Sequence, residues 1–427
     1  MWAVPAALFL VAFFHRVAPG VLAKDLMQAF GATGALIGLL SSTYFYAYAG
    51  FMIPGGVLID AYGVRRVVSA GGAVMAFGTL AMAWAETSFT LFVGRFLVGM
   101  GATVTFVGVL KIASVWFPPS RFGTLSALTA TVGIGGSLVA TAPLAWLAAL
   151  SGWRGAFALV GLATLASAVL CGCVVRDRPP GSPQILAPAG SALRRAVDGT
   201  LKVIGNRHTW PPFLTFFFLY SALQNMLLWA VPFLRDVYGV STTTAAYYAS
   251  ATSLALLVAA PLTGWLSDRV VHRRKAPYTM LTTGLVGLWL VLVVTLGALP
   301  LWGIFALFFV MGMFSAAFVL TWPIGREVNP PDLAGVAVAV VNLGGFLGAA
   351  ITQAFLGAVL DARWNGAMVD GARVYPAAAY QAAFTVCAVF VLASALLSLL
   401  LRETGGVNVY GAIVQDSAGV PRRSGRP

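Results

Sequence analysis

Three cations inside long apolar segments, Arg16, Arg95 and Lys111, are the residues of this 427-residue chain best placed to do chemistry. A charge near the centre of a bilayer costs about 3 kcal/mol on insertion scales, so such a residue generally faces a cavity or a partner. All thirteen Asp and Glu residues, by contrast, lie at the ends of these segments, in loops or in the C-terminal tail. A cationic cavity without an internal carboxylate would attract an anionic ligand.

Arg16 is the strongest candidate for ligand binding. It lies past the middle of its segment and follows His15, whose imidazole can titrate between pH 5 and 8 and move a proton. Adjacent residues are about 100° apart around a helix, so the two side chains need not face one cavity. Arg16 could instead donate to backbone carbonyls of a neighbouring helix, and Lys111 could extend to the membrane surface.

Neutral polar side chains in other apolar segments could complete a binding site. Tyr44 and Tyr48 are spaced i and i+4, so they share one helical face. Gln224, Asn225 and Asn342 carry amides that need partners when buried. Either substrate hydroxyls or neighbouring helices could supply these partners.

The elements that must position these residues are transmembrane helices. The chain is 59% hydrophobic and 9% charged, whereas a soluble protein carries roughly 25% charged residues. The apolar segments are too long and too free of alternation for a β-barrel, and helices otherwise satisfy the backbone in lipid. We therefore expect an all-α membrane protein with twelve transmembrane helices. The expected helices cover residues 3–23, 34–59, 67–85, 88–114, 122–147, 155–175, 211–233, 241–266, 276–297, 301–323, 333–359 and 377–401.

The segments divide into two six-helix halves, residues 1–175 and 211–401. A basic, proline-containing stretch at 176–210 is the expected cytoplasmic linker, and residues 402–427 form a polar tail that we expect to be disordered. The first segment has no basic region before it and contains Arg16, so it is expected to be a retained helix and not a cleaved signal.

The net charge of +13 does not indicate nucleic-acid binding, because the basic residues follow the membrane topology. With both termini inside, 18 of the 26 Lys and Arg residues fall in cytoplasmic loops or the tail, five outside and three within helices. This asymmetry is typical of a polytopic protein of the bacterial inner membrane. Three cysteines in apolar segments favour neither disulfides nor a metal site. No catalytic or phosphate-binding constellation occurs, so we expect neither an enzyme nor a cofactor.

One loop motif occurs twice. The first copy closes segment 34–59 and reads Gly56-Val-Leu-Ile-Asp60-Ala-Tyr-Gly63-Val-Arg65-Arg66. The second copy, 208 residues later, reads Gly264-Trp-Leu-Ser-Asp268-Arg269-Val-Val-His272-Arg273-Arg274-Lys275. In both, a glycine one helical turn before the aspartate lets a neighbouring helix approach while the carboxylate stays at the helix end.

We expect these motif residues to control a conformational change. Asp60 would pair with Arg65 and Arg66, and Asp268 with Arg269, in one facing state of the protein. The loop arginines could instead face anionic lipid headgroups.

The repeated motif resembles the loop signature of the major facilitator superfamily, G-x-x-x-D-[RK]-x-G-x-[RK]-[RK], which lies between the second and third helices with a weaker copy between the eighth and ninth. Ala61 departs from it where a basic residue is usual. The resemblance implies a secondary active transporter that works by alternating access, with parallel halves and a binding site between them near the midplane. Arg95 begins Arg95-Phe-Leu-Val-Gly99, which is similar to a helix-4 element of conformational coupling in that family. We expect a monomer.

Three short sequences are similar to the anion-cation and sugar-phosphate permease branches of the family. They are Phe14-His15-Arg16, Tyr44-Phe45-Tyr46-Ala47-Tyr48 and Trp116-Phe117-Pro118. The similarity implies that Arg16 matches a substrate-facing arginine and that the chain takes up a small organic anion. The helix at 211–233 lacks the second arginine of organophosphate antiporters, and Met52 stands where glutamine is frequent. A monocarboxylate or sugar acid therefore fits better than a phosphate dianion.

Coupling to protons would run through His15, through a protonated substrate or through substrate exchange, because no acid lies inside a helix. Three other functions stay open at this point. They are a drug-type efflux antiporter, a small-peptide transporter and, in a different class, a non-transporting membrane receptor or sensor.

Overall fold

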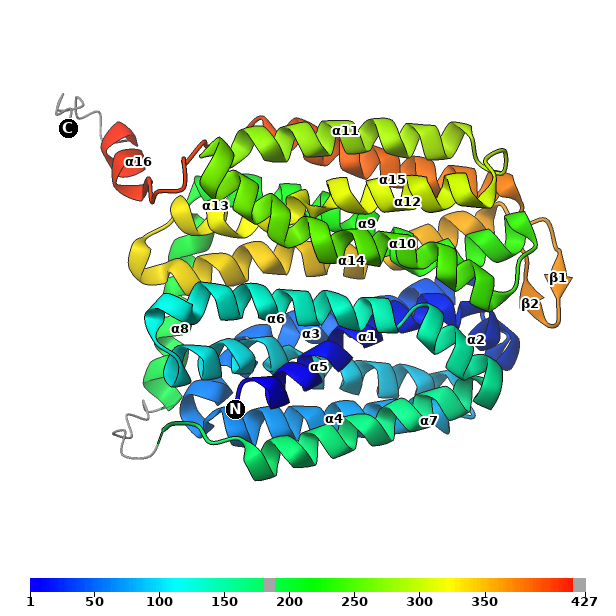
Figure 1. Cartoon of the computed structure of the whole chain (residues 1–427), viewed down its shortest axis with the longest axis horizontal. Helices are drawn as coiled ribbons and strands as arrows, with labels where there is room; N and C mark the ends of the chain where they lie inside the picture. The colour runs from blue at the N-terminus through cyan, green and yellow to red at the C-terminus, as the bar shows by residue number, and fades with distance from the viewer. Residues whose placement is uncertain (180–188, 418–427) are drawn as a thin grey trace.

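The computed structural model describes the backbone of residues 1–179 and 189–417, without the side chains of 119, 120, 122, 123, 127 and 189–196. Almost all of its regular structure is helical (Figure 1), which confirms the all-α class. The helices before residue 180 are α1 (Ala3–Val21), α2 (Ala23–Phe30), α3 (Gly34–Tyr62), α4 (Val64–Ala83), α5 (Ser88–Trp116), α6 (Pro119–Val139) and α7 (Ala142–Val174). Those that follow are α8 (Ala189–Gly205), α9 (Trp210–Tyr238), α10 (Thr242–Leu266), α11 (Lys275–Val294), α12 (Leu301–Ser315), α13 (Thr321–Glu327), α14 (Ala334–Ala362), α15 (Ala377–Ser398) and α16 (Tyr410–Ser417).

Eleven of the described helical segments are long and apolar enough to cross a membrane. The remaining expected crossing is a broken helix. It starts with α6, is interrupted at Ala140 and Thr141, and continues in the first part of α7. A non-helical residue, Gly152 (φ 69°, ψ 166°), then turns the chain into the next crossing. These pieces accommodate the twelve expected crossings.

Local sequence sets several helix ends. The hydroxyls of Thr33, Thr87 and Ser241 accept hydrogen bonds from the first turns of α3, α5 and α10, which satisfies backbone donors that a helix start leaves unpaired. Gly31 and Gly239 end α2 and α9 in the left-handed conformation that glycine adopts without strain.

The helices form two bundles that lie side by side (Figure 1). We call α1–α7 the first bundle, and α9–α15 the second bundle. The bundles meet mainly where α3 packs along α14, with further contacts of α1 with α9 and of α6 with α10. We call the end that carries Asp60 and Asp268 the motif end. The opposite end carries α2 and the short hairpin of β1 (Met368–Val369) and β2 (Ala372–Arg373), and we call it the hairpin end.

The contact between α3 and α14 depends on small residues. A Cβ added to Gly38 would lie 2.2 Å from the carbonyl oxygen of Gln353, and one added to Gly357 would lie 2.1 Å from that of Gly34. Helix backbones approach this closely only when side chains are absent at the contact. The glycines therefore fix how tightly the bundles meet near the hairpin end.

Two regions are more structured than the sequence predicts. The stretch 176–210 contains the helix α8, which packs on both α3 and α14. The tail was expected to be disordered, and for residues 402–417 that expectation is wrong, since they follow the second bundle and end in α16. Residues 418–427 lie outside the described part of the chain.

Candidate functional site

Arg16 lies on α1 at the seam between the bundles and is 5% exposed. Its Nε donates to the Tyr44 hydroxyl (3.4 Å) and its Nη1 to the Tyr220 hydroxyl (3.2 Å). Its guanidinium carbon lies 3.8 Å from the ring centre of Phe13 and 4.9 Å from that of Phe346. A buried guanidinium over aromatic faces gains about 2 kcal/mol per favourable contact. These contacts replace part of the hydration that Arg16 loses on burial.

We call Phe13, Tyr44, Tyr48, Tyr220 and Phe346 the aromatic cage. Its members come from α1, α3, α9 and α14, so both bundles contribute. Tyr48 stacks on Phe346 with ring centres 4.4 Å apart, and the Tyr44 hydroxyl is held by donating to the Ala12 carbonyl (3.0 Å). No ion pair of Arg16 with a carboxylate occurs among the described residues. The cage therefore holds a cation among neutral groups.

His15 faces away from the cage. Its ring Nε2 lies 3.1 Å from the Thr79 hydroxyl, which itself donates to the Met75 carbonyl (2.8 Å). The hydroxyl can therefore only accept from the imidazole, which assigns the proton of neutral His15 to Nε2. The ring Nδ1 is buried and has no hydrogen-bond partner among the described residues. The structure thus does not bring His15 and Arg16 to one pocket.

Arg95 is a second buried cation close to the first. Its Nη1 donates to the His15 carbonyl (2.6 Å), and its guanidinium carbon lies 4.9 Å from the ring centre of Tyr44. Its Nε and Nη2 are buried without a partner in the described chain. Tyr44 thus contacts both arginines. This could not be predicted from the sequence, because the three residues lie on three different helices. The two cations make this region strongly attractive to anions.

The amides of α9 and α14 form helix-to-helix contacts. Asn225 donates to the Thr352 hydroxyl (2.9 Å), and Gln353 donates to the Gln224 backbone carbonyl (3.3 Å). The side-chain oxygen of Gln224 is buried and unpaired among the described residues, and Gln224 lies one helical turn after Tyr220 of the cage. Asn342 approaches Met52 across the seam, with its amide nitrogen 3.9 Å from the sulfur.

At the motif end, Asp60 pairs with Lys111 (2.9 Å) and not with Arg65 or Arg66 as predicted. Both partners are about half exposed. Lys111 lies 16 residues after Arg95 on α5, which is about 24 Å along a helix. The structure therefore separates Lys111 from the cage. Arg65 instead donates from its backbone to Asp177 (2.8 Å) and from Nε to the Gly172 carbonyl (2.6 Å).

Close contact with Asp177 explains a glycine of the first motif. Gly63 ends α3 at φ 86°, and a Cβ added there would lie 2.5 Å from an Asp177 carboxylate oxygen. The other glycines, Gly56 and Gly264, have nothing within 4 Å of an added Cβ. Their expected contact with a neighbouring helix is absent in this conformation.

The second motif copy also forms an unexpected ion pair. Asp268 pairs with Arg274 and not with Arg269. Arg274 reaches Glu327 as well (3.2 Å), and Glu327 is 2% exposed. Burial acts to lower the pKa of Arg274, but Glu327 and Asp268 outweigh burial and raise it. The basic run that ends the motif was visible in the sequence, but its partner on α13 was not.

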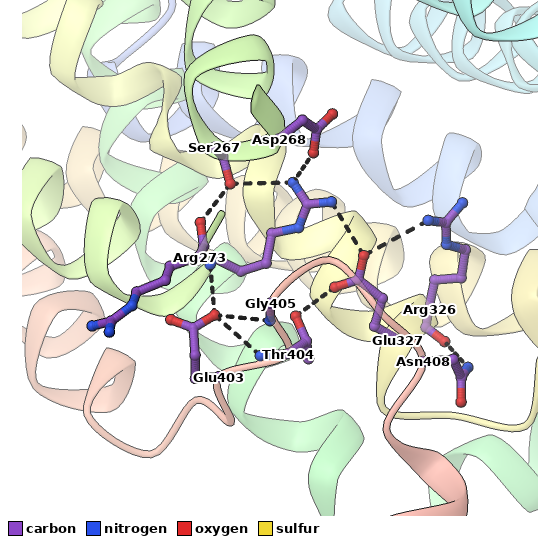
Figure 2. A network of polar contacts seen from close by, with 10 residues as sticks. Ser267, Asp268, Arg273, Arg326, Glu327, Glu403, Thr404, Gly405 and Asn408 are labelled. Atoms are coloured by element: carbon purple, nitrogen blue, oxygen red, sulfur yellow. Dashed lines mark hydrogen bonds and ion pairs between the residues drawn. The ribbon is translucent and has the colours of Figure 1, made fainter. Parts of the chain in front are cut away.

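The tail completes this network (Figure 2). Thr404 donates to Glu327, and Asn408 donates to the backbone carbonyls of Arg326 (3.2 Å) and Asn329 (2.9 Å). Glu403 accepts from the backbone N–H groups of Arg274 and Gly405, among others. Burial acts to raise the pKa of Glu403, but these N–H donors lower it below its usual value.

Two carboxylates join the bundles at the hairpin end. Asp236 of α9 pairs with Lys24 of α2 (2.6 Å), and both side chains are almost fully buried. Burial lowers the pKa of Lys24, although Asp236 acts in the opposite direction. Asp361 of α14 accepts from the backbone N–H groups of Gly34 (2.9 Å) and Ala35 (2.7 Å), which start α3. We call these contacts the interbundle network. Sequence analysis placed Lys24, Asp236 and Asp361 outside the apolar segments and gave them no role.

Two helical bundles with a buried cation at their seam, in a chain of membrane-spanning helices, define a membrane transporter. The chain belongs to the Major Facilitator Superfamily, whose sequence profile matches residues 6–353.

Individual relatives match this chain at low identity. The Probable sulfoacetate transporter SauU of Cupriavidus necator is 26% identical over 66% of this chain and 68% of its own. The Probable galactarate/D-glucarate transporter GudP of Bacillus subtilis is 24% identical over 86% and 88%. A bacterial homolog of the human lysosomal transporter Spinster, solved in an inward-facing and unoccupied conformation, superposes with a TM-score of 0.73 at 18% identity, covering 94% of this chain and 96% of the homolog.

Proposed function

We propose that this chain is a secondary active transporter that takes up a small organic anion, a monocarboxylate or sugar acid, together with protons. The observation that carries the proposal is the aromatic cage, in which Arg16 is buried at the seam with tyrosine hydroxyls as its polar partners. A carboxylate entering the cage would supply the missing counter-charge. Arginine presents a planar fork of donors that suits a carboxylate in two-point contact.

Other observations support an anionic substrate. Arg95 adds a second buried cation beside Tyr44. Two relatives carry names that refer to sulfoacetate and to galactarate or D-glucarate, all of which are organic acids. The hydroxyls of Tyr44, Tyr48 and Tyr220, with the unpaired oxygen of Gln224, could bind the hydroxyls of a sugar acid.

Transport requires that the bundles move. We propose that residues 1–175 and 211–401 rock as two bodies about the cage. The interbundle network closes the hairpin end in this conformation, and its contacts must break before that end can open. The pairs Asp60–Lys111 and Asp268–Arg274 lie at the other end and would be exchanged during the same motion. We place the motif end, with both termini, on the cytoplasmic side of a bacterial inner membrane, and we propose a monomer.

Proton coupling is proposed to use His15 or the substrate itself. No carboxylate pairs with Arg16 in the described ion pairs, and the buried acids Asp236 and Glu327 are paired at the two ends of the bundles, so no acid of the cage is available as the carrier. The unpaired Nδ1 of His15, whose ring faces away from the cage, is a free proton acceptor one residue before Arg16 on α1. Protonation there would add a charge close to Arg95, which makes proton uptake favourable only when an anion is bound.

The test measures thermal stabilisation of the purified protein by carboxylates, sugar acids, phosphate esters, dipeptides and cationic drugs. We expect stabilisation by one of the carboxylates or sugar acids, loss of it in Arg16→Ala, and partial retention in Arg16→Lys, because lysine keeps the charge but not the fork. Arg121→Ala, which removes an exposed arginine of the motif end, should respond like the wild type. Stabilisation only by cationic drugs would refute the proposal and favour efflux.

Uptake into proteoliposomes then tests transport and coupling together. We expect accumulation of the stabilising anion when the outside is more acidic than the inside, and none in Arg16→Ala. Binding without any uptake would instead favour a receptor or sensor.

A further inference from the structure

The helix α8 exposes an apolar face that the transport mechanism does not use. Val197, Leu201 and Ile204 are spaced so that they share one side of the helix, and they are 45%, 63% and 38% exposed. The opposite side holds Gly199 and Val203, of which Val203 is fully buried. Exposed apolar side chains on a short polar helix normally mark an interaction surface.

The packing of α8 sets the depth of this face in the membrane. Val203 lies in one apolar cluster with Ala337 and Val340 of α14, and Leu333 and Val336 pack against the same cluster. Leu333 lies directly before α14 and the cluster's α14 residues lie in its first two turns, within a segment that is long and apolar enough to cross a membrane. Because α8 lies against the side of those turns, its outer face is level with the start of this segment. Figure 1 shows α8 crossing the ends of both bundles there.

A basic hollow flanks the apolar face. It measures about 540 Å³ and lies between the end of α8 and the tail helix α16. Its lining residues are Lys202, Gly205, Asn206, Arg207, His208, Tyr410, Ile413 and Val414. No carboxylate lines it, and Asp198, the acidic residue of α8, lies outside the lining. Trp210 is 43% exposed beside it and donates to the Ile204 carbonyl (3.1 Å), a position typical of tryptophan at a membrane interface.

We propose that α8 is an interfacial helix whose basic hollow binds the headgroup of an anionic phospholipid. Val197, Leu201 and Ile204 insert among the acyl chains, and Lys202 and Arg207 meet the phosphate of the headgroup. Apolar residues on one side and cations on the flank are the arrangement by which amphipathic helices bind anionic membrane surfaces. Since α8 contacts both α3 and α14, a lipid bound to it would act on a helix that bridges the two bundles at the motif end.

The first test titrates phosphatidylglycerol into nanodiscs of phosphatidylcholine and follows the melting temperature. Each cation near an anionic surface contributes about five-fold in affinity, so the double variant Lys202→Gln/Arg207→Gln should need roughly 25-fold more phosphatidylglycerol for half of the effect. Both side chains are exposed, so the variant should fold. Arg121→Gln removes an equally exposed cation outside the hollow and should leave the titration unchanged.

Two outcomes would overturn the proposal. One is an equal response of the wild type and the double variant to phosphatidylglycerol. The other is equal stabilisation of the detergent-purified protein by soluble glycerol phosphate, which would make the hollow a site for a soluble anion and not for a lipid.

A second measurement places the apolar face directly. In a background in which the three cysteines are replaced, a nitroxide at Leu201→Cys should be accessible to oxygen and shielded from a polar nickel chelate. Val407→Cys, at a tail residue that is also 63% exposed, is the matched control and should show the reverse. Equal access of the nickel chelate to both labels would contradict insertion of α8 into the membrane edge.

Discussion

The interbundle network makes a quantitative prediction about the conformational equilibrium. In Asp236→Asn, Lys24 loses its charged partner while it stays buried. Removing one partner of a buried ion pair costs about 3–5 kcal/mol. We take the lower end of this range because the amide oxygen of the new Asn can still accept the hydrogen bonds that Lys24 and Tyr380 donate to Asp236. On the proposed motion, the network holds the bundles together only when the hairpin end is closed. A loss of about 3 kcal/mol therefore shifts the equilibrium toward the open hairpin end by roughly two orders of magnitude.

Distance measurements between spin labels test this prediction. Labels at Ala29 on α2 and Arg363 after α14, both exposed, report on the hairpin end. We expect one short distance in the wild type and a growing population of longer distances in Asp236→Asn. Asp370→Asn, which changes an exposed acid of the β1–β2 turn outside the network, should match the wild type.

A double variant separates this effect from misfolding. Lys24→Met/Asp236→Leu removes both charges, so no unpaired ion stays buried, and its thermal stability should recover relative to Asp236→Asn. If Asp236→Asn and Asp370→Asn give the same distance distribution as the wild type, the network does not hold the hairpin end closed and our reasoning is wrong.

Three further predictions concern other contacts. Gly38→Ala places a methyl group against the Gln353 carbonyl, so it should force α3 away from α14 and lower the melting temperature by several degrees, whereas Gly264→Ala, in open space, should not. Asp60→Asn breaks a half-exposed ion pair with Lys111 that is worth at most about 1 kcal/mol, so the melting temperature should stay the same. Turnover should fall by up to about five-fold without a change in substrate affinity. Unchanged turnover would contradict a gating role. Because the pKa of Glu403 is lowered, its stabilisation of the docked tail is complete above about pH 4.5 and is lost as the pH falls through the pKa of the folded state. Hydrogen exchange of residues 410–417 should therefore rise in that acidic range in the wild type. In Glu403→Gln it should be high at all pH values.

The sequence predicts the fold well because the membrane imposes strong rules on it. Apolar segments of spanning length must be helices, and their ends coincide with Thr33, Thr87 and the two prolines that follow Phe117. The broken crossing at Ala140 and Thr141 was not predicted, because an apolar run carries no mark of a local kink. The helix α8 was not predicted, although Val197, Leu201 and Ile204 have the spacing of one helical face, because it lies in a basic stretch that also contains prolines.

The sequence predicts several residues of the candidate site, but it does not predict which of them contact one another. Arg16 stands out as a cation in an apolar segment, and Tyr44 and Tyr48 share a helical face near it. Its contacts with Tyr220 and Phe346 come from helices more than 200 residues away, and no local pattern specifies them. Asp60 shows the same limit. Arg65 and Arg66 are its neighbours in sequence, but Lys111 reaches it because α5 runs beside α3.

The neutral surroundings of Arg16 have an electrical consequence for the transport cycle. On the proposed function, the empty cage carries one positive charge. Whenever the empty protein switches state, the cage that holds this charge opens to the other side of the membrane. A membrane potential acts on such a charge with about 2.3 kcal/mol per 100 mV. A bound monovalent anion cancels the charge of Arg16 and a co-transported proton restores it, so an interior-negative potential assists the inward step of the loaded carrier and opposes the outward return of the empty carrier. The resetting step, and not the arrival of the substrate, would then be the part of the cycle that voltage slows.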